Sequence, residues 1–261
     1  MTISAPERPV GALLREWRER RRLSQLELSA GAGVSTRHLS YVETGRSRPT
    51  RQMILRLCEH LEVPLRARNT LLLAGGHAPA YPVSTMDSPR LHAVLDAVRR
   101  LLDSQLPYPA VLVDAGWELV DANAAVGLLT EGSADFLLEP PVNVLRLSLH
   151  PKGMAPRIRN LGQWRGHILE RLQRQVAATG SPHLAELLAE LRGYPGGAEP
   201  ATGAEDVVVP LRYTARGHDL AFLSTTSIFG TPHDVTVAEL AVESFFPADQ
   251  PTAQALRELG C

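Results

Sequence analysis

The side chains best suited to acid–base chemistry in this 261-residue chain are its nine histidines and their acidic neighbours. The pairs His218-Asp219 and His233-Asp234 each place an imidazole beside a carboxylate in the sequence. Adjacent residues on a strand point to opposite faces of a sheet, so adjacency by itself does not make a catalytic pair. We therefore interpret both pairs as turn residues.

Other catalytic and metal-binding patterns are missing from the sequence. It contains no G-x-S-x-G nucleophile elbow, phosphate-binding loop, dinucleotide fingerprint or H-E-x-x-H zinc motif. Cys58 and Cys261 are too few for a disulfide framework or a four-ligand zinc cluster, and the histidines have no paired short spacings. We expect no catalytic residues, no metal and no resident cofactor.

The arginines are distributed very unevenly along the chain. Residues 1–68 contain 13 Arg and 7 Glu, a net charge of +6, whereas residues 69–261 contain 14 Lys and Arg against 21 Asp and Glu, a net charge of -7. Arginine beside phosphate releases condensed counterions, whereas an acidic surface is repelled by phosphate. The asymmetry predicts a polyanion as the partner of the first segment alone.

Length and composition indicate a folded protein of one large or two ordinary domains. Hydrophobic residues make up 44% and charged residues 21%, which excludes a disordered tail, a collagen and a coiled coil. The start MTISAPERPV has no signal-peptide core, and no run of about 18 apolar residues occurs, so we expect neither secretion nor membrane insertion. We expect a cytoplasmic location.

Apolar spacing and capping residues predict five short helices in the first domain, residues 8–76. Val10 to Arg22 has one apolar face, with its arginines, Arg18 among them, around the other side. Ser24-Gln25-Leu26-Glu27 has the form of a capping box, so the second helix begins at Gln25. Further helix starts and stops are predicted at Ser35, at Gly45, at Pro49-Thr50, at Pro64 and at Gly75-Gly76.

Two short helices joined by a Gly-containing turn within a basic five-helix unit are typical of helix-turn-helix DNA readers. The segment LSQLELSAGAGVSTRHLSYVETG resembles Xre-type, lambda-repressor-like DNA-binding domains in the Gln that begins the second helix, the turn glycine and the Glu-x-Gly that ends the third. The resemblance implies an all-α domain that binds double-stranded DNA with its third helix in the major groove. It places Thr36, Arg37, Ser40 and Tyr41 at base-reading positions and Ser24, Gln25, Arg46 and Arg48 at phosphate-contacting positions.

The rest of the chain is predicted to be an α+β domain over residues 89–250, after a Pro- and Ser-rich linker at 77–88 and before a C-terminal tail at 251–261. A helix from Ser88-Pro89 is followed by a strand pair around Ala115-Gly116. Helices are predicted from Arg159 to Ala178 and from Pro182 to Leu191, while Val142 to Leu149 fits strand or helix equally. Three closing strands are predicted in the runs Val207 to Tyr213, Asp219 to Thr226 and Val235 to Phe245.

The segments PYPAVLVDAGWELVDANAA, RLSLHP and FGTPHDVTVAELAVESFFPAD resemble the ligand-binding domain of MmyB-like transcriptional regulators. In that bacterial family an Xre-type domain precedes a PAS-like body, an antiparallel sheet with flanking helices. The resemblance implies a regulator whose body binds an apolar small molecule such as a fatty acid. An acyl ligand needs apolar walls and a polar anchor.

The predicted pocket residues fall into these two groups. Candidate walls are Leu145, Trp164, Ile168, Phe222 and Leu240, and candidate anchors are Asn123, Arg146, His150 and His167. Asn123 is also expected to cap the turn from strand to helix. The whole is interpreted as a homodimeric regulator of transcription. Two alternatives stay open: a second domain that serves only for dimerisation or protein interaction, and, as the weaker one, an enzyme tethered to DNA.

Overall fold

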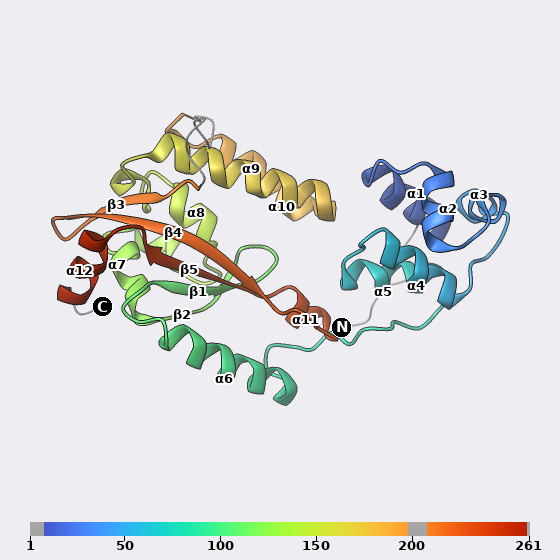
Figure 1. Ribbon diagram of the computed structural model, residues 1–261, viewed down its shortest axis with the longest axis horizontal. Helices are drawn as coiled ribbons and strands as arrows, with labels where there is room; N and C mark the ends of the chain where they lie inside the picture. The colour runs from blue at the N-terminus through green and yellow to red at the C-terminus, as the bar shows by residue number, and fades with distance from the viewer. Residues whose placement is uncertain (1–7, 198–207, 260–261) are drawn as a thin grey trace. The chain divides into compact units, whose positions relative to one another are not determined.

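The computed structural model describes residues 8–197 and 208–259, which form two compact units (Figure 1). The first unit holds the chain up to Ser84 together with residues 177–179 and the segment Pro232–Ala238, and the second unit holds the remainder. The predicted order, an all-helical domain followed by an α+β domain, is confirmed.

Five helices build the first unit, as the capping pattern predicts. The Ser24 hydroxyl accepts from the Glu27 amide while the Glu27 carboxylate accepts from the Ser24 amide, which is the predicted capping box. Ser35 accepts from the amide of His38 at the start of the third helix. The helices are α1 (Val10–Arg20), α2 (Gln25–Ala32), α3 (Thr36–Glu43), α4 (Arg51–His60) and α5 (Leu65–Ala74).

The core of this unit draws one apolar stripe from each helix, including Leu14, Leu39, Ile54 and Leu72, all fully buried. Helix α1 meets the C-terminal end of α3 at Gly11, where an added Cβ would lie 2.0 Å from the carbonyl oxygen of Val42. No side chain fits there, so glycine sets the distance between these two helices.

Residues 77–84, part of the predicted linker, pack onto the first unit. The side-chain oxygen of Asn69 accepts from the amides of Ala80 and Tyr81, and its nitrogen donates to the carbonyl of Tyr81. The Pro-rich composition of this stretch correctly disfavours helix and strand, but a buried side chain on α5 replaces the backbone partners that regular structure would supply.

A five-stranded antiparallel sheet forms the middle of the second unit, in the order β2-β1-β5-β4-β3. The chain's last strand inserts between the first and the fourth, with Glu243 opposite Val111 on one side and Thr226 on the other. This insertion joins two hairpins that are distant in sequence into one sheet. The strands are β1 (Ala110–Val113), β2 (Leu119–Ala122), β3 (Leu211–Ala215), β4 (His218–Ile228) and β5 (Ala241–Pro247).

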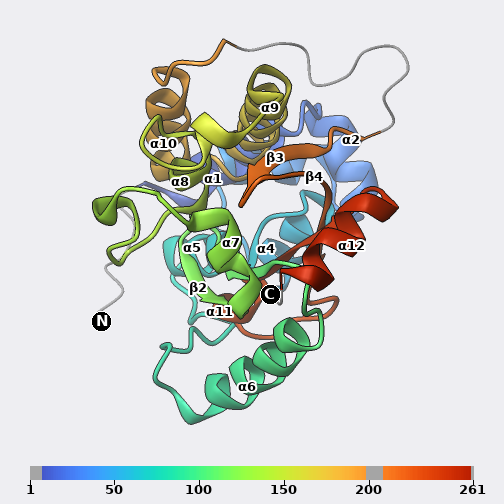
Figure 2. The same ribbon diagram turned by 90° about the vertical axis from the view of Figure 1, so that its left-hand side faces the viewer.

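Helices cover both faces of the sheet (Figures 1 and 2). The helix α6 (Pro89–Asp103) packs on β1 and β2 from one side, while α9 (Leu161–Thr179) and α10 (Pro182–Arg192) lie on the other. Shorter helices complete the unit: α7 (Gly127–Thr130), α8 (Val144–Leu149), α12 (Gln250–Glu258) and the 3-10 turns η1 (Ala124–Val126), η2 (Asp135–Leu137) and η3 (Ala155–Arg157). The short helix α11 (Val235–Ala238) belongs to the first unit.

The structure resolves one open prediction and corrects two predicted strands. The ambiguous run Val142 to Leu149 ends in helix α8. The strand predicted from Val235 to Phe245 is wrong in its first half, because Asp234 accepts from the amides of Thr236 and Val237 and starts helix α11 instead. The strand predicted from Val207 to Tyr213 starts later than predicted, because β3 begins at Leu211 and ends at Ala215. Val207 lies outside the described residues.

Most of the predicted C-terminal tail is helix α12. Asp249 accepts from the amide of Thr252 at its start, and the hydroxyl of Thr252 accepts from the amide of Ala221 on β4. Ala255 and Leu256 join the main core of the second unit. A nine-residue amphipathic stretch is too short to indicate a stable helix from sequence, whereas tertiary packing stabilises it. Residues 260–261 lie outside the described part of the chain.

Candidate nucleic-acid interface and ligand cavity

Helix α3 presents an exposed arginine stacked on a tyrosine. The guanidinium carbon of Arg37 lies 5.4 Å from the ring centre of Tyr41, and Arg37 Nε donates to the Tyr41 hydroxyl at 3.0 Å. Residues four apart share one face of a helix, which brings the two together. The bond to Tyr41 uses only Nε, so the two terminal nitrogens of Arg37 are not committed to it.

The other two predicted base-reading residues, like Tyr41, are half-buried. The Thr36 hydroxyl lies 2.7 Å from the hydroxyl of Ser29 and so joins the start of α3 to α2. Ser40 is half-buried, and its carbonyl accepts from the hydroxyl of Thr44. Of the predicted set, Arg37 is the exposed residue, and Tyr41 is its stacking partner.

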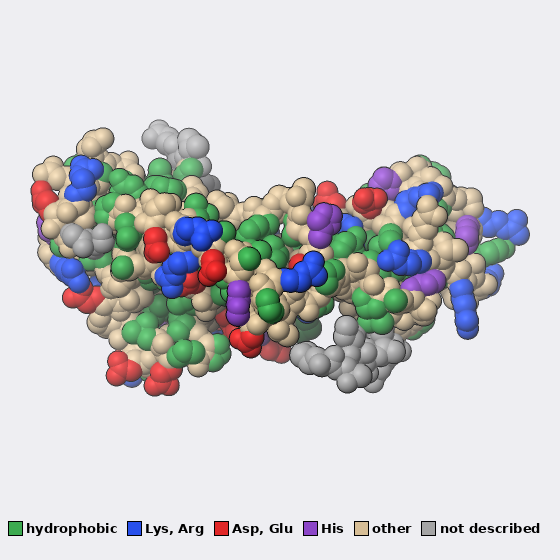
Figure 3. Space-filling model, turned by 90° about the horizontal axis from the view of Figure 1, so that it is seen from below, with side chains coloured by type: hydrophobic (Ala, Val, Ile, Leu, Met, Phe, Trp, Pro, Cys, Tyr) green, Lys and Arg blue, Asp and Glu red, His purple; other side chains and the backbone are tan. Residues whose placement is uncertain are grey.

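The predicted phosphate-contacting residues surround this helix within the same unit. Ser24 is the exposed N-cap of α2, and Arg46 and Arg48 are exposed in the loop after α3. Several basic side chains of the unit are visible in Figure 3. Gln25 is half-buried instead, because its side-chain nitrogen donates to Glu43 at 2.8 Å.

Helix α3 is oriented by a buried ion pair that the sequence pattern did not reveal. Arg18 was expected on the solvent side of α1, yet it donates from Nε and Nη2 to the two carboxylate oxygens of Glu43 at 2.8 and 2.9 Å. Its third nitrogen, Nη1, donates to the carbonyl of Leu23. The prediction of an exposed Arg18 is wrong because its partner lies 25 residues away, where no local pattern could show it.

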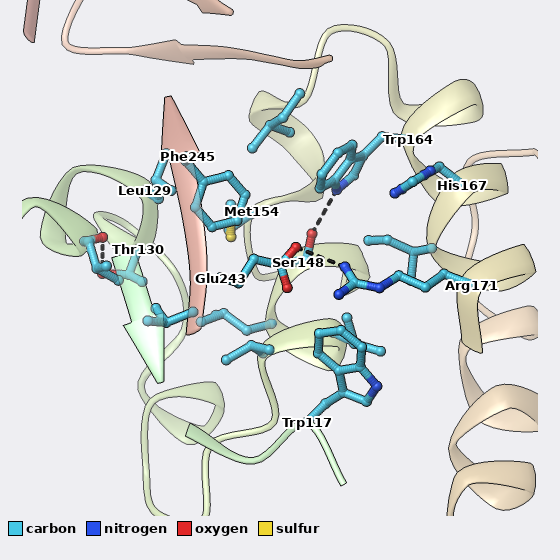
Figure 4. Close-up of a pocket in the computed structure, with 17 residues that line it drawn as sticks. Trp117, Leu129, Thr130, Ser148, Met154, Trp164, His167, Arg171, Glu243 and Phe245 are labelled. Carbon is cyan, nitrogen blue, oxygen red and sulfur yellow. Dashed lines mark hydrogen bonds and ion pairs between the residues drawn. The ribbon is translucent and has the colours of Figure 1, made fainter. Parts of the chain in front are cut away.

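The second unit contains a partly open cavity of about 70 Å³ between the sheet and helices α7, α8 and α9 (Figure 4). Its walls are mostly apolar. Four of the predicted pocket residues line it, namely Leu145, Trp164, His167 and Ile168. The other lining residues are Val111, Trp117, Val126, Leu129, Thr130, Val144, Leu147, Ser148, Met154, Arg171, Leu211, Glu243 and Phe245.

The remaining predicted pocket residues lie elsewhere. Phe222 and Leu240 are fully buried core residues that do not reach the cavity wall. Asn123 does not cap the following turn; its side chain is buried and bonds the backbone of Leu102, Tyr108 and Ala110. It thereby ties the end of α6 to the start of β1.

Two predicted anchors are held by other partners outside the cavity. Arg146 forms a two-bond ion pair with Glu190 of α10, at 2.7 and 2.8 Å. Because this guanidinium stabilises the carboxylate, the pKa of Glu190 falls to about 2. The ring of His150 packs edge-on against Phe136 and Tyr194.

An ion pair between the partly exposed Arg171 of α9 and the buried Glu243 of β5 lines one side of the cavity (Figure 4). Arg171 Nη1 donates to Glu243 Oε1 at 2.9 Å and Nη2 donates to the hydroxyl of Thr226 at 2.7 Å. The guanidinium carbon also lies 4.4 Å from the ring centre of Trp117. Sequence reasoning missed this pair; its one signal was a lone carboxylate within the apolar run of β5.

Burial governs the protonation of the ionisable groups that line the cavity. Glu243 is 6% exposed, and burial raises the pKa of its carboxyl although Arg171 opposes the shift. Burial, followed by the nearby Arg171 and Arg174, lowers the pKa of His167, whose ring stacks on Trp164. The Trp164 indole donates to the hydroxyl of Ser148 at 3.1 Å, so this part of the wall is already hydrogen-bonded.

The described ranges 8–197 and 208–259 show neither a metal-binding cluster nor a bilayer-spanning helix. These residues contain no cluster of three or more His, Cys, Asp or Glu side chains that could hold a metal ion. Among their helices, none combines the length and the apolar character that a bilayer-spanning helix requires.

The sequence matches two protein families, one for each part of the chain. Residues 94–259 match the family described as MmyB-like transcription regulator ligand binding domain. Residues 9–71 match a helix-turn-helix domain family. The first match spans the sheet, the helices around it and the cavity, and the second spans nearly all of α1 to α5.

Two solved structures are similar to the chain at low identity. The clp gene regulator ClgR from Corynebacterium glutamicum is 26% identical, with 38% of this chain and 90% of ClgR covered at a TM-score of 0.23. An RNA-binding light-oxygen-voltage receptor is 14% identical, with 96% of this chain and 63% of the receptor covered at a TM-score of 0.29. No curated protein matches the chain.

Proposed function

Because the chain belongs to the MmyB-like transcription regulators, with a helix-turn-helix domain ahead of the family's ligand-binding domain, we propose that it is a dimeric, sequence-specific regulator controlled by an apolar small molecule such as a fatty acid. The observation that carries the DNA-binding part is the Arg37–Tyr41 stack on the outer face of α3. A planar guanidinium that keeps its terminal nitrogens available suits bidentate contact with guanine O6 and N7.

Phosphate contacts set the position of such a unit on DNA. The exposed Arg46 and Arg48 after α3 and the amide groups at the start of α2 beside Ser24 are suited to phosphate oxygens. In a dimer, two α3 helices read half-sites separated by about 34 Å or a multiple of it. We therefore expect a roughly palindromic operator.

The cavity supports the ligand part of the proposal. Its lining is mostly apolar and carries a small number of polar groups, which is the usual composition of a small-molecule site. Regulation requires that the ligand bind one conformation of the dimer more tightly than another, because an equal affinity for both shifts nothing.

The DNA-binding proposal is tested with the Arg37→Ala and Arg37→Lys variants of the full-length protein. After selection of the operator from a random DNA pool, fluorescence anisotropy compares affinity for the operator with affinity for a scrambled duplex. Loss of a bidentate base contact costs roughly 1 to 3 kcal/mol on the operator and much less on the scrambled duplex. Lysine keeps the charge but lacks the planar fork, so we expect Arg37→Lys to lose specificity as well.

A matched control for these variants is Arg56→Ala, an exposed arginine of α4 in the same unit. Equal losses on both duplexes for Arg37→Ala would show that Arg37 contacts phosphate and does not read bases. The ligand proposal is tested by native mass spectrometry of the full-length protein beside a denatured sample. An added mass that disappears on denaturation supports a bound small molecule, and the same spectrum reports whether the protein is a dimer.

A further inference from the structure

The start of helix α3 carries a hydroxyl group whose hydrogen-bonding direction is set by a neighbouring helix. Helices α2 and α3 lie side by side in the first unit (Figure 1). Ser29 of α2 is 2% exposed, and its hydroxyl oxygen lies 2.9 Å from the carbonyl oxygen of Leu26 and 2.7 Å from the hydroxyl oxygen of Thr36. Thr36 is the first residue of α3 and is half-buried, so solvent reaches part of it.

The protons of these two hydrogen bonds can be assigned. A carbonyl oxygen only accepts, so the bond between Ser29 and Leu26 uses the Ser29 proton. A serine hydroxyl has a single proton, which leaves the Thr36 proton for the bond between the two hydroxyls. Thr36 therefore donates to Ser29, and Ser29 donates to Leu26. For any further partner, the Thr36 oxygen offers lone pairs and no proton.

Reversal of this chain of hydrogen bonds is unfavourable. For Thr36 to donate outward, the Ser29 proton would have to turn from the Leu26 carbonyl to the Thr36 oxygen. The bond to Leu26 would then be lost around a buried hydroxyl, which lowers the population of the reversed arrangement roughly 2- to 10-fold. Threonine by itself can donate or accept, so the direction is a property of the folded unit.

The next side chain along α3 has the opposite polarity. Arg37 is exposed and can only donate, and its bond to Tyr41 does not use its two terminal nitrogens. In the major groove, adenine N6 and cytosine N4 donate, whereas guanine and thymine present keto oxygens that accept. The acceptor of Thr36 and the donors of Arg37 therefore suit bases of opposite kind.

We propose that Thr36 accepts a hydrogen bond from a base amino group, adenine N6 or cytosine N4, and that the buried Ser29 imposes this choice without touching DNA. The inference rests on the proposed base reading by α3, and it adds the kind of base that one position of each half-site must hold. Every base pair shows one amino and one keto group in the major groove. Inversion of the pair at this position would thus set a keto oxygen against the Thr36 lone pairs, with no proton between them.

The experiment uses the operator that the full-length protein selects from a random DNA pool. Fluorescence anisotropy measures affinity for duplexes in which each base pair of one half-site is inverted in turn, for the wild type and for Thr36→Val, which removes the hydroxyl at nearly constant shape. We expect one position where the wild type prefers adenine or cytosine to the inverted pair and where Thr36→Val has lost this preference.

Two base analogues test the amino group at that position directly. Purine in place of adenine, or 2-pyrimidinone in place of cytosine, removes the amino group and leaves the rest of the base. The substitution should weaken binding of the wild type roughly 2- to 10-fold, which is the effect of one neutral hydrogen bond. Binding of Thr36→Val should not weaken by this amount, because that variant has no hydroxyl to accept the bond.

Ser29→Ala tests what sets the direction. It removes the partner that takes the Thr36 proton, and alanine favours helix, so α2 is retained. The Thr36 hydroxyl can then donate or accept, and we expect the preference for an amino base to fall towards equality with keto bases. Thr36→Ser keeps the hydroxyl and should keep the preference.

Ser104→Ala is the matched control for Ser29→Ala. Ser104 also donates to the carbonyl oxygen three residues earlier, that of Leu101, but it belongs to the second unit. Its removal should leave every base preference as in the wild type. Circular dichroism checks that each variant is folded.

The outcomes separate this inference from the proposed function. A preference for a keto base at the position that Thr36→Val alters, or an unchanged preference in Ser29→Ala, would overturn the inference while base reading by α3 stands. The same holds if Thr36→Val alters no position of the operator. Failure of the wild-type protein to select any operator would overturn sequence-specific binding itself, and the inference with it.

Discussion

Arg18 of α1 and Glu43 of α3 form a buried, two-bond ion pair, with Nε to Oε1 at 2.8 Å and Nη2 to Oε2 at 2.9 Å. Glu43 also accepts from Gln25 at the start of α2. One carboxylate thus joins three helices at the point where α3 leaves the core. The outward face of α3, with Arg37 and Tyr41, is oriented by this group.

Removing one partner of this pair should destabilise the first unit more than removing both. Arg18→Met or Glu43→Leu leaves one buried charge without a partner, at a cost of about 3 to 5 kcal/mol, whereas the double variant replaces both charges with apolar groups. Hydrogen–deuterium exchange of α1 and α3 peptides is the measurement. Faster exchange in each single variant and recovery in the double variant are expected; equal exchange in all three would contradict the prediction.

Gly11→Ala should also destabilise the first unit. The new Cβ would lie 2.0 Å from the Val42 carbonyl oxygen, which is backbone and must move, and overpacking of this kind costs about 1 to 3 kcal/mol. Gly127→Ala is the control, since no atom lies within 4 Å of its added Cβ and alanine favours helix. Urea denaturation should show a lower midpoint for the first variant and an unchanged or higher one for the second.

The Arg146–Glu190 pair should make stability depend on pH in acid. The pKa of Glu190 in the folded protein is about 2, below its ordinary value, so the folded state binds this proton less readily than the unfolded chain. The contribution is therefore complete above the ordinary glutamate pKa and is lost as the pH falls towards 2. The difference in urea midpoint between wild type and Glu190→Gln should shrink from pH 6 to pH 3. A constant difference would show that Glu190 titrates normally.

Cys58 should be unreactive in the folded protein. It is fully buried in the core of the first unit, and burial raises the pKa of its thiol to about 12. The thiolate is the reactive form, so little of it exists near neutral pH. In a Cys261→Ser background, a thiol reagent such as DTNB should react only as fast as this unit opens, and urea should accelerate the reaction. Rapid labelling without urea would show that the core around α4 is open.

Local patterns were sufficient for the first unit. Helices α2, α3 and α4 start at a capping serine or threonine whose partner lies three residues away, α1 and α5 start after a proline, and the core follows the spacing of apolar residues along each helix. Because the partners in these contacts are close to each other in the sequence, the five helices could be predicted. The same short range explains why Arg18 was misplaced, because its partner lies on another helix.

Local patterns were sufficient for only some of the residues that line the cavity. Leu145, Trp164, His167 and Ile168 could be predicted because apolar faces of helices turn inward. Arg146, His150 and Asn123 were chosen as polar residues near those faces, but each is satisfied by a partner that only the fold brings close.

The sequence by itself determined the order of the two domains and the family to which the chain belongs. It also determined the five helices of the first unit and its exposed Arg37. All of these follow from short motifs and from the distribution of charge. Tertiary structure decided the polar chemistry of the cavity. Strand β5 enters the sheet between β1 and β4 and brings Glu243 to Arg171, 72 residues away in the sequence. A pairing of that kind is set by sheet topology and burial, which no local pattern of residues encodes.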